Sequence, residues 1–477
     1  TDVTLGGLSV TPLSSNTTAV LSGAGNVTVD GKFSWSGGTL EGSGKLITRG
    51  SDSLISGSST KVLQRGIDNA GTIAWTDGGI QVADGVVFNN LEGATFDARS
   101  DDSFTNSLAT FNNAGTLLKS GGNNVSRFSP LLNNSATGTV QVQSGTLELR
   151  GGGSSSGTFQ IDVGTLRVNG GSYVLNDGWN ASGPGNFQIS SGTVQAAGSG
   201  SIAGALSLGS FSGAILTGAG DITVDGAFNW SGGKLQGSGK LITNGTSTLS
   251  GSSMILERSV DNRGTATWTA GSVGGTGGVY NNLAGAFFDV QANIGTFGGT
   301  AITFNNAGTL QRTAGTSTAT IGATLDNSGL IDIQSGRLTF SGGGSSSGNI
   351  QVGAGNSLRI QGGTMVLDTA TSDTGKTWSG DGTLEFVSGT LQVNTDVTLG
   401  GLSVTPLSSN TTAVLSGAGN VTVDGKFSWS GGTLEGSGKL ITRGSDSLIS
   451  GSSIKVLQRG IDNEGTIAWT DGGIQVA

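Results

Sequence analysis

Residues 21–50, LSGAGNVTVDGKFSWSGGTLEGSGKLITRG, return at residues 216–245 as LTGAGDITVDGAFNWSGGKLQGSGKLITNG, with 22 of 30 positions identical. Phe33 and Trp35 are kept between the two copies, whereas the residue before each of them changes. Polar change at alternate positions beside unchanged apolar residues is the period-two pattern of strands with one buried face. A helix would keep residues three and four positions apart. The segment therefore predicts an all-β fold.

A longer repeat surrounds this segment. Residues 1–83 recur almost unchanged at residues 395–477, with two differences over the 83 paired positions. The looser copy between them divides the chain into unit 1 at 1–198, unit 2 at 199–394 and a partial unit 3 at 395–477. Because no composition shift or proline-rich linker marks a boundary, we expect one continuous repeat array rather than separate globular domains.

A shorter phrase recurs inside each unit: a glycine, a small polar residue and an alternating strand, as in GNVTV at 25–29 and GTVQV at 138–142. Between residues 25 and 157 the steps from one such glycine to the next run from 19 to 27 residues. A propeller blade needs about 40 residues, and a sandwich ends after seven to nine strands. The spacing predicts a right-handed parallel β-helix, a β-solenoid, with about 20 to 23 residues per coil.

Asparagine recurs with the same step. The intervals are 21, 23 and 21 residues in the first unit and 20, 24 and 21 in the second. Stacked coils would place these amides at one corner, where each can donate to the next and accept from the one before. Asn-rich turns without a ladder are the alternative. The residues predicted to form the ladder are Asn69, Asn90, Asn113, Asn134, Asn262, Asn282, Asn306, Asn327 and Asn463.

Aromatic residues also recur in phase with their apolar neighbours. Tryptophan is often a sugar-stacking residue, so a carbohydrate platform is one interpretation, but the shared phase favours a stacked core. The predicted core aromatics are Phe33, Trp35, Trp75, Phe228, Trp230, Trp268, Phe427, Trp429 and Trp469.

Composition excludes several classes. Glycine supplies 89 of 477 residues without a Gly-X-Y period, which excludes collagen. The 23 basic and 32 acidic residues give a net charge of −9, which disfavours nucleic acid or an anionic membrane as partner. No stretch has the roughly 20 apolar residues of a membrane-spanning helix.

Histidine and cysteine are absent, so Ser-His-Asp and Cys-His catalysis, thiolate metal sites and histidine-based metal sites cannot be built. Carboxylate chemistry remains possible, for example at Asp101 and Asp102 near Arg99. Another candidate precedes a glycine turn in all three units, as Asp30, Asp225 and Asp424, where aspartate is favoured for local hydrogen bonding. We predict no catalytic residue, no metal site and no cofactor, and expect that the chain is not an enzyme.

The phrases NNAGTL at 112–117 and 305–310 and QSGTL at 143–147 resemble repeats of large exported bacterial β-helix proteins, the filamentous-haemagglutinin-like exoproteins and autotransporter-type adhesins. The resemblance implies an extracellular or surface-tethered structural protein: an adhesin stalk, surface fibre or biofilm-matrix filament. The alternative is a β-helix that binds or processes carbohydrate with surface carboxylates and aromatics. Cell-surface or matrix polysaccharide is a further possible partner.

Residues 1–83 and 395–477 are almost identical even at polar positions. Folding tolerates polar change at exposed positions, so it does not explain this identity, which indicates a recent duplication. We therefore expect a segment of a longer tandem array. Its partner would be itself, through further coils or through end-to-end stacking of copies into filaments.

Overall fold

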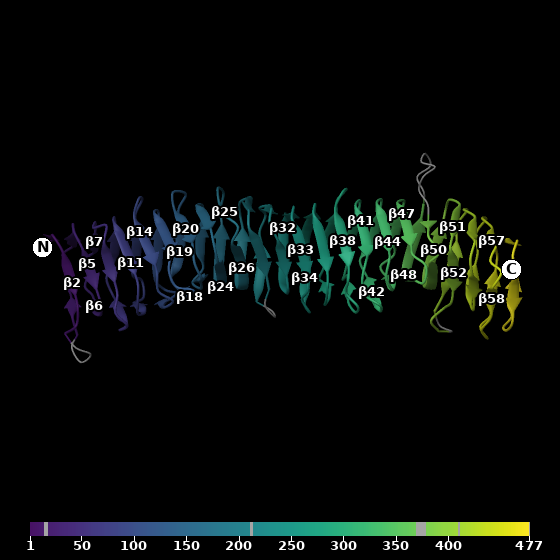
Figure 1. Ribbon diagram of the computed structural model, residues 1–477, viewed down its shortest axis with the longest axis horizontal. Coiled ribbons are helices and arrows are strands. Elements are labelled where there is room, and N and C mark those ends of the chain that lie inside the picture. The colour runs from purple at the N-terminus through teal and green to yellow at the C-terminus, as the bar shows by residue number, and fades with distance from the viewer. Residues whose placement is uncertain (14–17, 210–212, 369–377, 409–410, 477) are drawn as a thin grey trace. The chain divides into compact units, whose positions relative to one another are not determined.

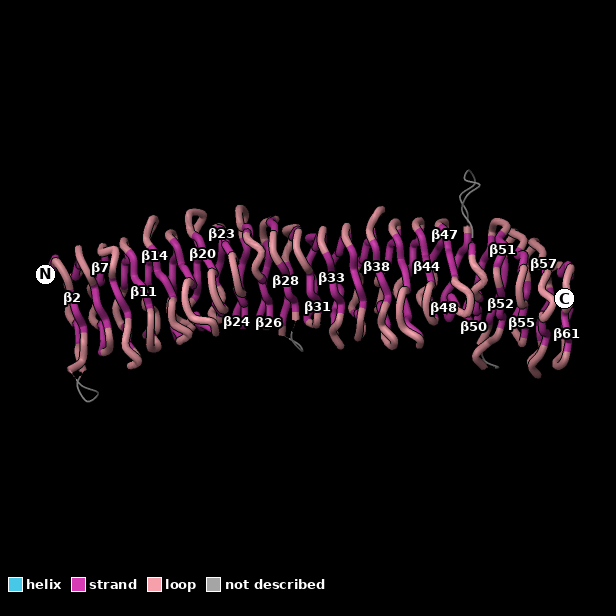
Figure 2. Tube along the Cα trace, viewed as in Figure 1, coloured by secondary structure: helices cyan, strands magenta, loops and turns pink. Residues whose placement is uncertain are grey.

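The computed structural model describes residues 1–13, 18–209, 213–368, 378–408 and 411–476, which form 62 β-strands and no helix. Parallel strands stack about 21 residues apart and form a β-solenoid of about 22 turns (Figures 1 and 2). The predicted all-β, parallel β-helical fold is thereby confirmed. The chain divides into two compact units, Thr1–Asn244 and Gly245–Ala477. Their boundary falls inside the second sequence repeat.

Most turns of the first compact unit contain three short strands, each hydrogen-bonded to its counterpart on the next turn. The first column contains β1 (Val3–Leu5), β4 (Val27–Val29), β7 (Leu46–Thr48), β10 (Ile67–Asn69), β13 (Val87–Asn90), β16 (Thr110–Asn113), β19 (Leu131–Asn134) and β22 (Gly153–Ser155). The second contains β2 (Leu8–Val10), β5 (Phe33–Trp35), β8 (Ser53–Ile55), β11 (Thr72–Trp75), β14 (Thr95–Ala98), β17 (Thr116–Lys119), β20 (Thr139–Val142), β23 (Thr158–Ile161), β25 (Asn180–Ser182), β27 (Gly200–Ile202) and β30 (Ile222–Val224). The third contains β3 (Val20–Leu21), β6 (Gly38–Leu40), β9 (Lys61–Leu63), β12 (Ile80–Val82), β15 (Ser103–Thr105), β18 (Val125–Phe128), β21 (Thr146–Leu149), β24 (Thr165–Leu175), β26 (Asn186–Ala196), β28 (Ala205–Leu208) and β31 (Phe228–Trp230). The 11-residue strands β24 and β26 continue round a corner into the first column, which β29 (Ala214–Thr217) and β32 (Gly233–Thr243) extend.

The second compact unit repeats this plan. One column contains β33 (Thr246–Leu249), β35 (Thr265–Trp268), β38 (Phe287–Val290), β41 (Thr309–Arg312), β44 (Leu330–Ile333), β47 (Asn349–Val352) and β49 (Trp378–Ser379); beyond it β51 (Val397–Leu399), β54 (Val421–Val423), β57 (Leu440–Thr442) and β60 (Ile461–Asn463) form a four-stranded sheet. Another contains β34 (Met254–Asn262), β37 (Val279–Asn282), β40 (Thr303–Asn306), β43 (Thr324–Asn327) and β46 (Gly344–Ser346), and later β53 (Ala413–Ser416), β56 (Gly432–Leu434), β59 (Lys455–Leu457) and β62 (Ile474–Val476). The third contains β36 (Val273–Gly274), β39 (Thr296–Phe297), β42 (Thr318–Ile321), β45 (Arg337–Phe340), β48 (Ser357–Leu367), β50 (Thr383–Val393), β52 (Gly401–Val404), β55 (Phe427–Trp429), β58 (Ser447–Ile449) and β61 (Ile467–Trp469).

Glycine at the corners has a steric cause. Gly42 has a φ of 99°, and a β-carbon there would collide with the carbonyl oxygen of Gly23 on the preceding turn. Its counterparts Gly237 and Gly436 have φ values of 101° and 102° and the same close neighbour one turn back. Only glycine meets both conditions without strain, which explains part of the high glycine content.

Successive repeats of the sequence are shifted by one column. In the first compact unit β4 belongs to the column that begins at β1, whereas its sequence counterpart β30 belongs to the column that begins at β2. The repeat is therefore not a whole number of turns. Equivalent residues of successive repeats consequently point to different sides of the solenoid.

The interior is filled by stacked side chains. Phe88 lies on Phe111 with ring centroids 4.7 Å apart, and Tyr280 lies on Phe304 at 5.3 Å. Eight of the nine predicted core aromatics are buried: Phe33, Trp35, Trp75, Phe228, Trp230, Trp268, Phe427 and Trp429. Stacking of rings in register gives each turn a large buried apolar area.

Trp469 is the exception, with 61% of its surface exposed, so its assignment to the core is wrong in this structure. Its counterpart Trp75 lies in β11, which pairs with β14 on the following turn. Trp469 lies in β61, which among the described strands pairs only with β58 on the preceding turn. The same residue is buried or exposed according to whether a further turn covers it.

Candidate functional site

The predicted asparagines form a hydrogen-bonded column inside each compact unit. In both, the side-chain amide Nδ2 of one asparagine donates to Oδ1 of the asparagine one turn later. The distances are 2.8 Å for Asn69–Asn90, Asn90–Asn113 and Asn113–Asn134, 2.9 Å for Asn262–Asn282, and 2.7 Å for Asn282–Asn306 and Asn306–Asn327. All of these side chains are buried.

Hydroxyl groups terminate these columns. Thr48 Oγ1 donates to Asn69 Oδ1 at 2.9 Å, and Asn134 Nδ2 donates to Ser155 Oγ at 3.1 Å. In the second unit Asn327 Nδ2 donates to Ser346 Oγ at 2.9 Å. A hydroxyl can donate or accept, so it completes either end of a directional column. The buried amides are thereby satisfied from one end to the other.

Asn463 does not join an asparagine column. It is exposed in β60, accepts a hydrogen bond from Thr442 Oγ1 at 2.9 Å, and among the described residues has no asparagine stacked on it. The prediction of a ladder position is wrong here for the reason that applies to Trp469: no described strand lies on the next turn.

A second column of polar side chains, which the sequence analysis missed, runs along the outside of the same strands. Asn89 Nδ2 donates to Asp68 Oδ1 at 2.6 Å, Asn112 Nδ2 to Asn89 Oδ1 at 2.9 Å, and Asn133 Nδ2 to Asn112 Oδ1 at 3.1 Å. The donors point back along the chain, opposite to the inner column. The repeated Asn-Asn pairs in the sequence are the signal that could have revealed it.

Buried cations are another feature that the sequence analysis missed. Lys61 donates to the carbonyl oxygens of Gly57 and Asp77, and Arg65 donates to those of Gly44 at 2.8 Å and Gly25 at 3.1 Å. Burial lowers the pKa of Lys61. The other buried cations are Lys119, Arg258, Arg312, Lys455 and Arg459. Hydrogen bonds from Arg65 to two earlier turns show that such cations hold stacked corners together.

The carboxylates considered for catalysis are engaged elsewhere. Asp101 Oδ1 lies 2.9 Å from Lys119 Nζ; burial alone would raise the pKa of Asp101, but the hydrogen bond and charge of Lys119 lower it. Asp102 Oδ2 accepts from Ser100 Oγ at 3.0 Å, and Arg99 Nε pairs with Asp97 Oδ2 at 2.6 Å. The turn aspartates lie one per repeat: Asp30 pairs with Arg49 at 3.1 Å, Asp424 with Arg443 at 3.2 Å, and Asp225 accepts from Asn244 at 2.7 Å. None of these contacts pairs two carboxylates.

Two clusters of arginine around one glutamate lie at related places in the two compact units. In the first, Glu148 is paired with Arg150 Nε at 2.6 Å and Arg167 Nη1 at 3.2 Å. Although burial alone would raise the pKa of Glu148, the hydrogen bonds and charge of these arginines lower it.

In the second cluster, Glu385 on β50 lies between two arginines from earlier turns. Arg337 Nη2 lies 2.8 Å from Glu385 Oε1, and Arg359 Nη2 lies 2.7 Å from Glu385 Oε2. Burial alone would raise the pKa of Glu385, but the hydrogen bonds from Arg337, Arg359 and Ser357 lower it. Glu385 therefore remains ionised near neutral pH.

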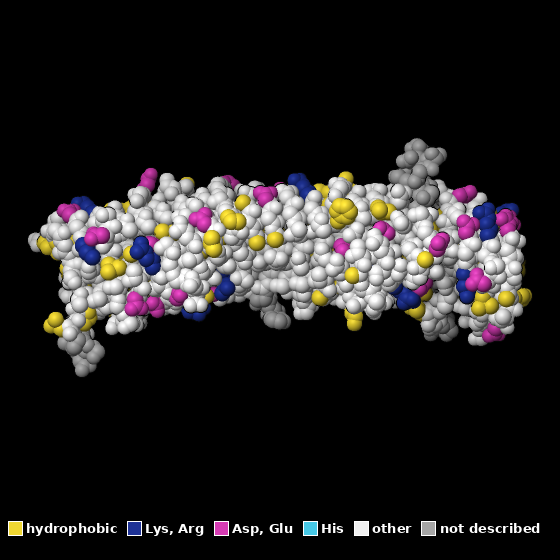
Figure 3. Space-filling model, in the orientation of Figure 1, with side chains coloured by type: hydrophobic (Ala, Val, Ile, Leu, Met, Phe, Trp, Pro, Cys, Tyr) yellow, Lys and Arg dark blue, Asp and Glu magenta, His cyan; other side chains and the backbone are white. Residues whose placement is uncertain are grey.

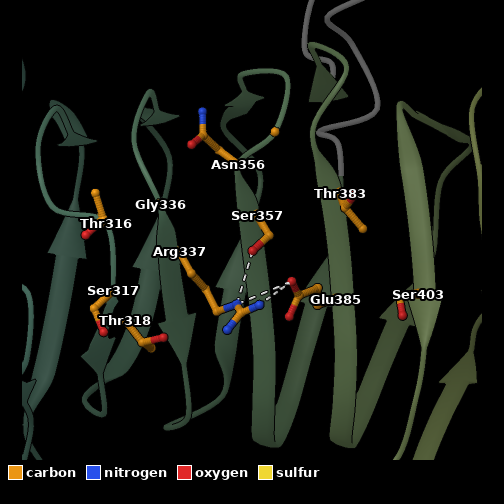
Figure 4. Close-up of a pocket in the computed structure, with 11 residues that line it drawn as sticks. Thr316, Ser317, Thr318, Gly336, Arg337, Asn356, Ser357, Thr383, Glu385 and Ser403 are labelled. Carbon is orange, nitrogen blue, oxygen red and sulfur yellow. Dashed lines mark hydrogen bonds and ion pairs between the residues drawn. The ribbon is translucent and has the colours of Figure 1, made fainter.

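The second cluster lies in an open groove of about 530 Å³ (Figure 4). Arg337 reaches from β45 past Ser357 on β48 to Glu385 on β50. The remaining lining residues carry hydroxyls, an amide or no side chain: Thr316, Ser317, Thr318, Gly336, Gly355, Asn356, Thr383 and Ser403. The groove is thus polar, with the guanidinium group of Arg337 against the carboxylate of Glu385, while Arg359 pairs with Glu385 without lining the groove.

On the face shown in Figure 3, charged side chains occur singly or in small groups, with scattered hydrophobic side chains, among the backbone and the remaining side chains. Among the described residues no group of three or more acidic side chains could hold a metal ion. A helix capable of crossing a membrane is likewise not found in the described part of the chain. No family model matches this chain, and no curated protein or solved structure gives a significant match.

Proposed function

We propose that this chain is a structural segment of an exported surface fibre or matrix filament, in which the solenoid acts as a spacer or an adhesin stalk. The observation that carries the proposal is the stacking of buried polar side chains along the inside of the solenoid. In each compact unit the buried asparagines form internal hydrogen-bonded columns, such as Asn69 to Asn134, that join one turn to the next. Repeated parallel pairing and stacked side chains stabilise a solenoid turn by turn.

Association with further solenoid turns or with other copies of the chain is part of this proposal. Its support is the almost unchanged recurrence of residues 1–83 at residues 395–477, the pattern of a tandem array whose units stack on one another. The extracellular location rests on the resemblance of the repeats to those of exported β-helix proteins.

Single-molecule force spectroscopy tests the mechanical role. When the chain is pulled from its ends, we expect stepwise rupture, because a turn unfolds only after its ladder breaks. A turn of about 21 residues releases about 70 Å of contour length at roughly 3.4 Å per residue. Smooth extension at low force would contradict a load-bearing role. Absence of the chain from the surface and medium of intact producing cells would contradict export.

Processing of carbohydrate by paired carboxylates, the enzymatic alternative, is not favoured by the groove. Glycoside hydrolysis usually needs two carboxyl groups, one of them protonated to act as the acid. The groove has one carboxylate, Glu385, and its arginine partners lower its pKa. Binding of carbohydrate without catalysis places no such demand on the groove.

A further inference from the structure

We propose that the groove around Arg337 binds a hydroxyl-rich saccharide that carries a single carboxylate. The inference goes beyond the structural role above and does not depend on it. It rests on three observations: the hydrogen-bonding groups that line the groove, the donors that remain on its arginines, and the charges around it.

The lining suits a hydroxyl-rich ligand. Apart from the charged groups, its side chains are short hydroxyls and the amide of Asn356, and no aromatic or aliphatic side chain lines it. Thr318, Arg337, Ser357 and Thr383 are in register on four successive turns. Adjacent turns are about 4.8 Å apart, so a polar group is presented at each step along the groove. A chain of sugar rings lying across the turns could place a hydroxyl at each step.

The arginines retain donors for an anion. Guanidinium has five N–H donors, and Arg337 uses Nε for Ser357 and Glu385 and Nη2 for Glu385. Its Nη1 makes no hydrogen bond with the described residues, and its side chain is 35% exposed. Arg359, 20% exposed, bonds Glu385 through Nε and Nη2. A carboxylate can accept two parallel hydrogen bonds from a guanidinium group.

The surrounding charge limits the ligand to one carboxylate. In the lining itself, the charge of Arg337 is balanced by Glu385. Arg359 does not line the groove but pairs with Glu385 from beside it, so the three-residue cluster carries one net positive charge. A neighbouring groove, which shares Thr383, is lined by Asp381, Asp424 and Asp446 against one cation, Lys426, and is therefore net negative. The whole chain has a net charge of −9. A polyanion would meet repulsion beyond the arginines, whereas one acidic sugar within a neutral glycan would not.

Two matched ligand pairs test the proposal by isothermal titration calorimetry on the full chain: sialyllactose against lactose, and cellobiouronate against cellobiose. At least one acidic member should bind roughly tenfold or more tightly than its neutral partner, since a charge-assisted bidentate contact is worth that factor. Added salt should weaken this difference. Equal binding within both pairs, or no binding by either acidic sugar, would overturn the proposal.

Variants separate recognition from folding. Arg337→Thr introduces the residue found at the corresponding position of the first repeat, Thr146, and should reduce the acidic ligand to the affinity of the neutral one. Glu385→Gln, which copies Gln188, removes the competing carboxylate and should tighten binding of the acidic ligand. If Arg337, Arg359 and Glu385 only stabilised the fold, Glu385→Gln would not increase the affinity for the acidic ligand. An unchanged affinity in either variant would overturn the assignment.

Arg150→Ser is the matched control. Arg150 belongs to the related cluster in the first compact unit, is 41% exposed, and corresponds to Ser341 in the second repeat. The control should bind the acidic ligand as the unmodified chain does. A similar loss in this variant would show that binding depends on surface arginine in general and would refute the groove as the site.

Discussion

Replacement of Asn90 by alanine is the sharpest test of the inner asparagine column. The buried Asn90 side chain accepts a hydrogen bond from Asn69 Nδ2 at 2.8 Å and donates to Asn113 Oδ1 at 2.8 Å and to the Thr116 carbonyl oxygen at 3.0 Å. Alanine removes these three bonds and a longer one to the Ala94 carbonyl oxygen at 3.4 Å, and leaves their partners in the interior, where water does not replace the lost amide.

The expected loss of stability follows from these contacts. Each bond contributes about 1 kcal/mol net, and a buried partner left unsatisfied costs about 1 to 3 kcal/mol. Asn69 Nδ2 keeps bonds to the carbonyl oxygens of Gly71 and Thr95, which limits the penalty on that side. We therefore expect Asn90→Ala to destabilise the surrounding turns by about 3 to 5 kcal/mol.

Asn89→Ala supplies the control on the adjacent, outward-facing position. Asn89 is also bonded above and below, to Asn112 at 2.9 Å and Asp68 at 2.6 Å, but it is partly exposed. Water can replace these partners, so its loss should cost about 1 kcal/mol or less.

Hydrogen exchange measured by mass spectrometry is the appropriate assay, because solenoid turns unfold locally and a single global transition would average the effect. Asn90→Ala should speed exchange in β10, β13 and β16, and Asn89→Ala should not. Equal exchange in the two variants would refute the argument that the inner column stabilises the turns by its burial.

Trp75→Ala should destabilise its turn by about 3 to 5 kcal/mol, whereas the same substitution at the exposed counterpart, Trp469→Ala, should destabilise its turn by about 1 kcal/mol or less. Hydrogen exchange measures both losses, and equal losses would contradict the argument from burial. Burial lowers the pKa of Lys61, so below pH 10.5 the unfolded chain binds more protons than the folded chain, and the free energy of unfolding should rise towards that pH. Urea denaturation should show a smaller rise in Lys61→Met, which introduces the residue at the corresponding position of the second repeat, Met254. Because the pKa of Glu385 is lowered in the folded chain, its ion pairs stabilise the fold above about pH 4.5, and this stability is lost as the pH falls through the lowered pKa. Acid titration should show no such loss of stability in Glu385→Gln, and the same pH profile in the variant and the unmodified chain would be evidence against these pairs.

Some features of the candidate sites could be predicted because they recur in the sequence. The phase of Phe33 and Trp35 indicates their buried side, and the spacing of Asn69, Asn90 and Asn113 matches the spacing of the glycine phrases. Such periodicity is local information: alternation selects the face of a strand, and a constant step brings equivalent residues to one column.

The inward position of Lys61 could not be predicted in the same way. In the strand Lys-Val-Leu, hydrophobicity alone does not favour an inward lysine over Val62, yet Lys61 and Leu63 face inward. The side chain is tolerated because the carbonyl oxygens of Gly57 and Asp77, from the ends of two different loops, surround its ammonium group. Only the stacking of turns brings those loops together.

By itself, the sequence determined the class of fold, the length of a turn and the identity of the inner columns, because each depends on repeated short-range pattern. The tertiary structure decided which columns succeed each other, which cations are buried, and how Arg337, Arg359 and Glu385 meet. Arg337 and Glu385 are 48 residues apart in sequence and meet only because two turns of ladder place β45 and β50 on the same face. The same cause makes Trp75 buried and Trp469 exposed: burial depends on the neighbouring turn, which the local pattern does not contain.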